Sequence, residues 1–128
     1  MKENYIAYKG TEYTIEWYFD EKGNSQSKDY LLNLSPSAQR KVFYLFKRMA
    51  DFGKISDKTK FRNEGDAIFA FKPQPERFLS FFVKDKRIII TNAFRKKTDK
   101  LPKNEKEKAL KCKADYLKRT KEGKYYEE

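Results

Sequence analysis

The chain has 128 residues, which is the size of one ordinary domain and too short for two full-sized ones. Aromatic residues make up 16% of it, with 11 Phe and 9 Tyr, and this content argues against an intrinsically disordered chain. Lys and Arg total 30 against 19 Asp and Glu, so the formal charge is +11. A small domain this basic is expected to meet a polyanion, or a partner protein that masks the charge.

The residue types that are missing exclude several classes of enzyme. The chain has no histidine, which excludes Ser-His-Asp and Cys-His triads and every His-containing metal site. The one cysteine, Cys112, cannot form an intramolecular disulfide or a thiolate metal cage, and this favours the reducing cytoplasm. The longest apolar runs are about five residues, so we expect no transmembrane helix. We also expect neither a metal nor a cofactor.

The first half of the chain predicts one strand and two helices. Residues 1–12 are expected to be loose, although Tyr5, Ile6 and Tyr8 could add an edge strand. The β-branched and aromatic run 13–19 predicts a first strand, and residues 25–34 predict a short helix. Ser35-Pro36 is typical of a helix start. The helix that follows is expected to end near Gly53 and to carry one apolar stripe, made of Ala38, Val42, Leu45, Met49 and Phe52.

The second half predicts a meander followed by a helix. After a polar, basic connection at 54–65, extended segments at 66–72, 77–83 and 87–94 are separated by two short turns, which is typical of antiparallel strands. Pro102 is expected to open a C-terminal helix with a thin apolar face. The tail, 123–128, is expected to be frayed.

These elements predict an α+β fold with a single domain over residues 1–128 and a core at about 13–119. The first strand must pair with the three-strand meander to give an antiparallel sheet, because it cannot stand alone. We expect the helix pair to cover one face of this sheet, with the opposite face and its basic rim left open for RNA.

Positive charge is concentrated between Lys72 and Lys100, where nine cations stand against three anions. Arg77 opens one strand and Arg95 closes the next, so both lie at the same edge of an antiparallel pair, and Lys72 reaches this edge too. The sequence therefore predicts two or three cations around one phosphate. Lysines in a hairpin turn also protect sheet edges against aggregation. This interpretation explains Lys84 and Lys86 better than phosphate binding does.

If the polyanion is RNA, its cleavage at a 2′-hydroxyl would need a base, an acid, and positive charge to stabilise the phosphorane. Without histidine, the charge must come from Arg or Lys. Lys96 or Lys97 could move protons if neighbouring cations lower the lysine pKa, and the sequence does not choose between them. Asp99 could take over the proton transfer instead, although the favoured interpretation is that Asp99 caps the helix that Pro102 opens.

Three segments carry a resemblance to a known family. They are Phe69-Ala-Phe-Lys72 with its proline turn, Arg77-Phe-Leu-Ser-Phe-Phe, and the strand from Arg87 that runs through Arg95-Lys96-Lys97 to Pro102. Their order resembles the RelE/ParE toxin superfamily, most closely its HigB-like, phage-derived branch.

The resemblance implies a toxin of a type II toxin–antitoxin pair that cuts mRNA on the ribosome without a metal and is neutralised by a cognate antitoxin, here a helix-turn-helix, HigA-like one. It also leaves open a gyrase-inhibiting, ParE-like toxin or an inactive relative that still binds the antitoxin. The expected catalytic residues are Arg77, Arg95, Lys96 and Lys97. The expected RNA-binding residues are Lys72, Lys84, Arg87, Phe94 and Lys100, with Phe94 as the candidate for base stacking.

Overall fold

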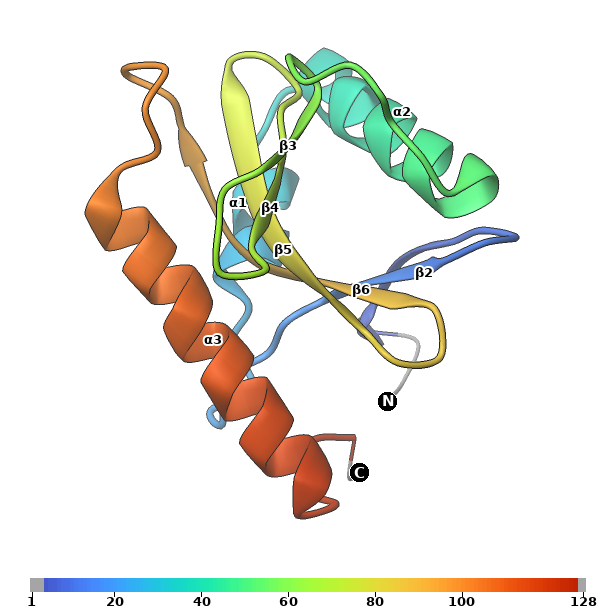
Figure 1. The fold of residues 1–128 in the computed structure, drawn as a ribbon, viewed down its shortest axis with the longest axis vertical. Coiled ribbons are helices and arrows are strands. Elements are labelled where there is room, and N and C mark those ends of the chain that lie inside the picture. Colours follow the sequence, from blue (N-terminus) through green and yellow to red (C-terminus); the bar gives the residue numbers. More distant parts are fainter. Residues whose placement is uncertain (1–3, 127–128) are drawn as a thin grey trace.

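The computed structural model describes residues 4–126 and shows one six-stranded sheet between two layers of helix (Figure 1). Residues 1–3 and 127–128, which belong to the termini expected to be loose, lie outside the described part. The sheet has the order β1-β2-β6-β5-β4-β3. The elements are β1 (Ile6–Lys9), β2 (Thr14–Trp17), α1 (Gln26–Leu32), α2 (Pro36–Phe52), β3 (Phe61–Asn63), β4 (Phe69–Phe71), β5 (Glu76–Val83), β6 (Arg87–Arg95) and α3 (Lys103–Lys121). The predicted α+β class is confirmed.

Helix α2 begins and ends where its capping residues indicate. The Ser35 side chain accepts a hydrogen bond from the Ala38 amide, and Pro36 occupies the first turn. Gly53 ends the helix with a left-handed φ of 77°. The apolar stripe buries Val42, Leu45 and Met49 together with Phe46 and Ala50. Phe52, predicted on this stripe, is exposed, because it lies on the outer side of the last turn.

The sheet differs from the predicted one in two places. The first strand does pair with the meander, but β2 runs parallel to β6, with Thr14 opposite Arg87 and Trp17 opposite Ile90. A further strand, β3, lies in the segment expected to be an irregular connection, where Phe61 pairs with Phe71 of β4. β1 confirms the alternative of an N-terminal edge strand, and it pairs with β2.

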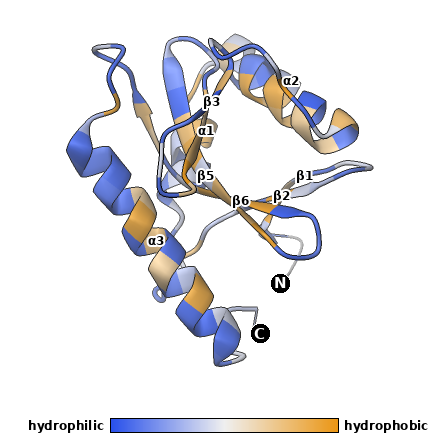
Figure 2. Ribbon diagram, in the orientation of Figure 1, coloured by the Kyte–Doolittle hydropathy of each residue, from blue (hydrophilic) through white to orange (hydrophobic). Residues whose placement is uncertain are grey.

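Both faces of the sheet are covered, which corrects the expectation that one face is open for RNA. On one face, α1 and α2 pack over residues such as Trp17, Phe78 and Ile88. On the other face, α3 buries Ala109 and Tyr116 against Leu79, Phe81 and Ile89. Figure 2 shows that most of α3 and the loop before it are hydrophilic, while β5 and β6 between the layers are hydrophobic. Within residues 4–126, the part of the sheet that the helices leave uncovered is therefore its rim.

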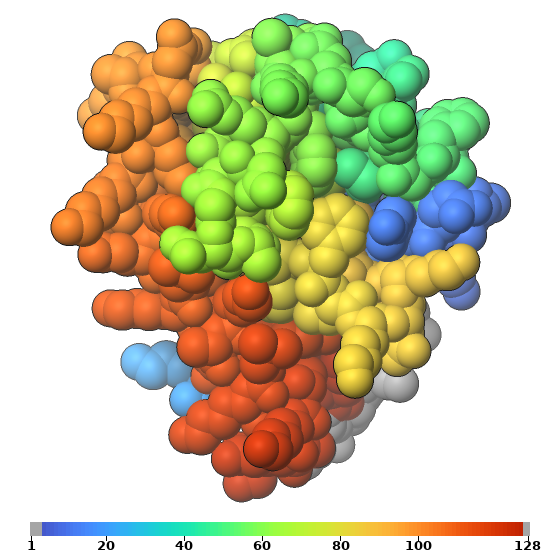
Figure 3. Space-filling view, viewed as in Figure 1, coloured from blue at the N-terminus to red at the C-terminus, as the bar shows by residue number. Residues whose placement is uncertain are grey.

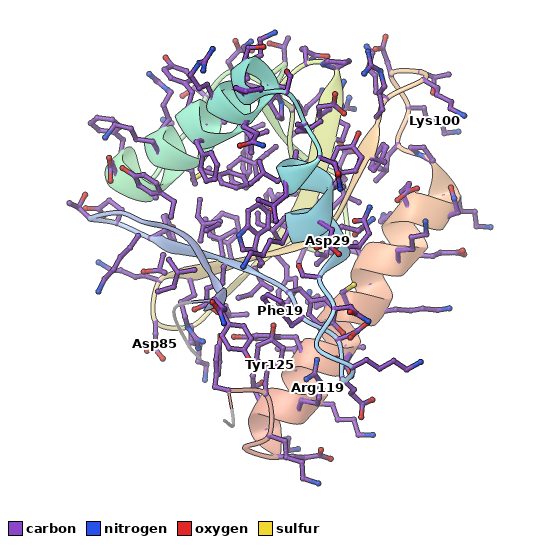
Figure 4. The ribbon with its side chains drawn as sticks, turned by 180° about the vertical axis from the view of Figure 1, so that it is seen from behind. Phe19, Asp29, Asp85, Lys100, Arg119 and Tyr125 are labelled. Atoms are coloured by element: carbon purple, nitrogen blue, oxygen red, sulfur yellow. The ribbon has the colours of Figure 1, made fainter. Side chains whose placement is uncertain are left out.

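The C-terminal tail is packed rather than frayed as far as it is described. Tyr125 is buried against the rings of Tyr5, Tyr18 and Tyr116, and its hydroxyl accepts a hydrogen bond from the Phe19 amide at 2.9 Å. In Figure 4, Tyr125 lies beside Phe19 and Arg119. The tail prediction was wrong because two aromatic side chains supply the anchoring area that its polar composition hides.

Gly10 lets the β1–β2 hairpin touch α2, and its replacement is a sensitive test of this packing. A Cβ at this position would overlap the carbonyl group and the Cβ of Ala50. The same carbonyl accepts hydrogen bonds from the amides of Glu12 and Tyr13, so the hairpin cannot easily move away. We expect Gly10→Ala to lower the free energy of unfolding by about 1–3 kcal/mol. Urea denaturation measures this loss, and Glu12→Ala, which changes an exposed side chain in the same hairpin, should stay close to the parent.

Candidate functional site

A β-bulge controls which side chains meet at the end of the β5–β6 hairpin. From the turn up to Ser80 and Ile90 the two strands pair residue by residue, and then the register shifts, so that Phe78 pairs with Ala93. The extra residue in β6 is held by groups from both helical layers. Gln26 of α1 exchanges two hydrogen bonds with the backbone of Ala93, and the Asn92 side chain donates to Glu105 of α3. The bulge is therefore a fixed feature of the sheet.

The bulge sends Arg77 and Arg95 to opposite faces of the sheet. Arg77 pairs with Phe94 on the face that α3 covers, whereas Arg95 pairs with Glu76 on the face of α1. In a hairpin without the extra residue Arg77 would face Ala93, and Arg95 would share its face. The two arginines thus lie at the same edge, as expected, but their side chains do not converge on one phosphate.

Arg77 is a nearly buried cation, with only 7% of its surface exposed. Its Nη1 donates to the Gln74 side chain at 3.2 Å and to the Glu76 carbonyl at 2.9 Å. Nε and Nη2 have no hydrogen-bond partner within residues 4–126. Burial lowers the pKa of this guanidinium from its ordinary value because it disfavours the charge, and an anion at the free donors would offset that cost.

Lys72 and Lys96 stand on the same side as Arg77. Burial, followed by the charges of Arg77 and Arg62, lowers the pKa of Lys72. Lys96 follows Phe94 by two residues, so it shares the α3 face, and its ammonium pairs with the Asp99 carboxylate at 2.6 Å. That ion pair lowers the pKa of Asp99, and the charges of Lys72 and Arg77 act in the same direction. These four residues, Lys72, Arg77, Lys96 and Asp99, are called the rim cluster below.

Arg95 belongs to a different environment. Its guanidinium lies 3.6 Å from a carboxylate oxygen of Glu76, a buried side chain that also accepts a hydrogen bond from the Tyr30 hydroxyl of α1. Arg95 itself is largely exposed. It is paired with an acid on the α1 face, so the structure separates it from the rim cluster.

Lys84 and Arg87 lie at the far end of the hairpin from the rim cluster. Figure 4 shows Asp85, in the same turn, and Lys100 at opposite ends of the molecule. The Arg87 guanidinium donates to the hydroxyls of Tyr116 and Tyr126, at 2.9 and 2.6 Å, and so ties the C-terminal tail to β6. The structure gives Arg87 a packing role and does not bring either residue to the site.

The remaining expected residues surround the rim cluster more loosely. Lys97 and Lys100 are exposed on the loop after β6, and Lys100 lines a shallow hollow of about 410 Å³ at the start of α3. Phe94 is half-buried and packs against the core under α3, so its ring is only partly available for stacking. Asp99 is not the helix cap it was expected to be: Pro102 occupies the N-cap position of α3, and no side chain caps the helix.

Sequence reasoning missed two residues beside the cluster. Arg62 pairs with Ala70, so it stands on the α3 face near Lys72, but its strand was interpreted as a loop. Gln74, in the turn between β4 and β5, orients Arg77. A polar residue between two prolines was the signal that could have identified Gln74, because a turn this constrained fixes the side chain it carries.

The described residues contain neither a metal-binding cluster nor a membrane-spanning helix. Within residues 4–126, no group of three or more acidic or cysteine side chains could hold a metal ion. No helix in that part of the chain is both long enough and apolar enough to cross a membrane.

The fold and the site define a small, basic α+β protein with a cation cluster at the rim of its sheet. Residues 29–114, about two thirds of the chain, match the family model described as "Phage derived protein Gp49-like (DUF891)". The chain belongs to this Gp49-like family, which is a family of RelE-like toxins. Membership implies an antitoxin partner in general terms. A search among curated proteins found no matching relative.

Proposed function

We propose that the protein is the toxin of a type II toxin–antitoxin pair and cleaves mRNA on the translating ribosome in the cytoplasm, without a metal, in the manner of HigB-like toxins. The observation that supports this best is the convergence of Lys72, Arg77 and Lys96 at one end of the sheet, with two donors of a nearly buried arginine left for an anion. A helix-turn-helix, HigA-like antitoxin is the proposed partner.

The cluster supplies the three groups that the reaction needs. Lys72, whose pKa is lowered, takes the proton of the 2′-hydroxyl as the 2′-oxygen attacks phosphorus. Arg77 stabilises the charge that develops on the phosphorane oxygens. The bond to the 5′-oxygen breaks, and the ammonium of Lys96, which Asp99 holds in place, donates a proton to that oxygen. The products are a 2′,3′-cyclic phosphate and a 5′-hydroxyl. Arg95 and Lys97 have no step in this scheme.

Expression of the protein with and without the neighbouring open reading frame tests the proposal. We expect growth arrest, cuts inside coding regions that carry 5′-hydroxyl ends, and recovery when the antitoxin is made. Intact mRNA together with signs of DNA breakage would instead favour a gyrase inhibitor. Growth without arrest would show an inactive relative.

The pH dependence of cleavage reports on Lys72. The neutral amine is the active form, so the rate is expected to rise with pH until it passes the lowered pKa of this lysine. Lys72→Arg keeps the charge but cannot lose a proton in this range, so it should remove the rising limb and cost about 10²-fold in rate. Single-turnover cleavage of ribosome-bound mRNA between about pH 7 and 9 measures both.

Lys84→Arg, at the other end of the hairpin, is the matched control and should keep the parent profile. If the cleavage rate of Lys72→Arg still rises with pH, the general base is another residue.

A further inference from the structure

A basic groove lies next to the rim cluster and takes no part in the chemistry above. It has a volume of about 870 Å³ and lies between α2 and the segment 54–60, which runs back along the helix (Figure 1). The turn between β4 and β5 closes one end of it. Its lining includes the basic and aromatic residues Arg40, Lys41, Tyr44, Arg48, Lys54 and Lys60. This set of side chains is called the α2 groove below.

The charges of the α2 groove fit a polyanion. Five of its lining residues are cations, and none of the five forms an ion pair within residues 4–126. Asp57 is the one acid in the lining, and its carboxylate is occupied by two hydrogen bonds from Thr59. Unpaired cations gathered around a hollow attract phosphate groups.

The groove also presents a flat surface suited to a base. Tyr44 is 60% exposed, although it is a large aromatic residue on a helix. The Arg48 guanidinium lies over this ring, 5.9 Å from its centre, which puts a cation next to an aromatic surface in the lining of the groove. Leu45, Ile55 and Pro73 add apolar surface to the lining of the groove. Nucleic-acid sites that bind single strands combine these same features, which are cations along a groove and an aromatic ring for stacking.

The α2 groove is continuous with the rim cluster through Gln74. This side chain lines the groove, accepts a hydrogen bond from Arg77, and donates another to the Thr59 carbonyl at 3.3 Å. Lys72 likewise reaches across to the Lys58 carbonyl at 3.3 Å. In Figure 3 the segment between α2 and β4, in green, fills this face between α2 and the loop before α3. An RNA whose cleaved phosphate lies at Arg77 would therefore meet the α2 groove on one side.

We propose that the α2 groove binds the single-stranded RNA that flanks the cleaved phosphate, with a base stacked on Tyr44 and neighbouring phosphates on Arg48 and Lys60. This inference rests on the proposed function, but it concerns binding rather than cleavage. An acidic segment of a protein partner is the other ligand class that a basic groove attracts. The continuity with the rim cluster favours RNA, and the test separates the two.

The test uses a fluorescein-labelled RNA of eight nucleotides with 2′-O-methyl groups, which the reaction above cannot cleave. Fluorescence anisotropy gives its Kd for the full chain at several salt concentrations. Tyr44→Ala is expected to weaken binding about tenfold, and Tyr44→Phe to retain it, because the ring is what stacks. The double variant Arg48→Ala/Lys60→Ala should reduce the slope of log Kd against log salt by roughly 1–2.

Lys111→Ala, which removes an exposed cation on α3 far from the groove, is the matched control and should bind like the parent. Unchanged binding in Tyr44→Ala and in the double variant, with weaker binding in Arg77→Ala, would overturn the inference and leave the proposed function intact. A parent chain that does not bind the probe would overturn the inference as well. A groove variant that no longer binds the antitoxin but still binds the RNA would also overturn the inference. Loss of RNA binding in Tyr44→Ala supports the inference even if the chain cleaves nothing.

Discussion

Arg77→Ala is expected to reduce the rate of mRNA cleavage by about 10²–10³-fold, the usual cost of removing one preorganised donor to a developing oxyanion. The guanidinium is held by Gln74 and by the Glu76 carbonyl, so its free donors are fixed before RNA binds. Single-turnover cleavage of ribosome-bound mRNA measures the effect, and growth on expression should be restored. Antitoxin binding should persist, because the exchange removes no part of the fold beyond one side chain at the rim.

Arg95→Ala is the matched control, since it removes a cation from the same edge but from the opposite face. We expect cleavage within a few-fold of the parent. A loss at Arg95 as large as the loss at Arg77 would show that both faces contribute to the site and would refute the assignment to the α3 face.

The second large effect concerns stability. Tyr125→Ala is expected to lower the free energy of unfolding by about 3–5 kcal/mol, as other buried aromatic-to-alanine changes do. Tyr125 contacts four other tyrosine rings, and the Arg119 guanidinium lies 4.6 Å from the centre of its ring. Tyr125→Phe keeps the ring and loses only the hydrogen bond from Phe19, so it should cost about 1 kcal/mol. Urea denaturation followed by circular dichroism measures both.

Lys124→Ala changes the exposed neighbour and should leave stability within about 0.5 kcal/mol of the parent. If Tyr125→Ala were equally neutral, the tail would be frayed in solution, as its composition alone suggests.

The parts of the fold that could be predicted are those with a local signal. The Ser35-Pro36 start, the Gly53 end and the apolar stripe between them locate α2, because capping and periodicity act within one helix. β3 has no such signal. It is three residues long with two polar members, and it exists because β4 offers it a partner. The tail was missed for the same reason, since the tyrosines that hold it come from distant segments.

The sequence predicted that Arg77 and Arg95 lie at one edge of the sheet, and they do, but their side chains are on opposite faces. The turn at Asp85 gives the pairing near the hairpin, and counting from it places Arg77 and Arg95 on one face. The bulge at Thr91 and Asn92 adds one residue and exchanges Arg95 for Lys96. No pattern in the sequence of β6 indicates the bulge, because the residues that hold it, Gln26 and Glu105, lie in other elements.

The measurement that tests the central claim most directly is an NMR titration that follows the arginine Nε–Hε signals as a short 2′-O-methyl RNA is added. The account predicts that the Arg77 signal shifts with saturation and that the signals of Arg95 and Arg87 stay in place. Arg77 has free donors on the α3 face at this rim, whereas Arg95 is paired with Glu76 on the opposite face and Arg87 with two tyrosine hydroxyls at the other end of the hairpin. A saturable shift at Arg95 or Arg87 with Arg77 unchanged would contradict it.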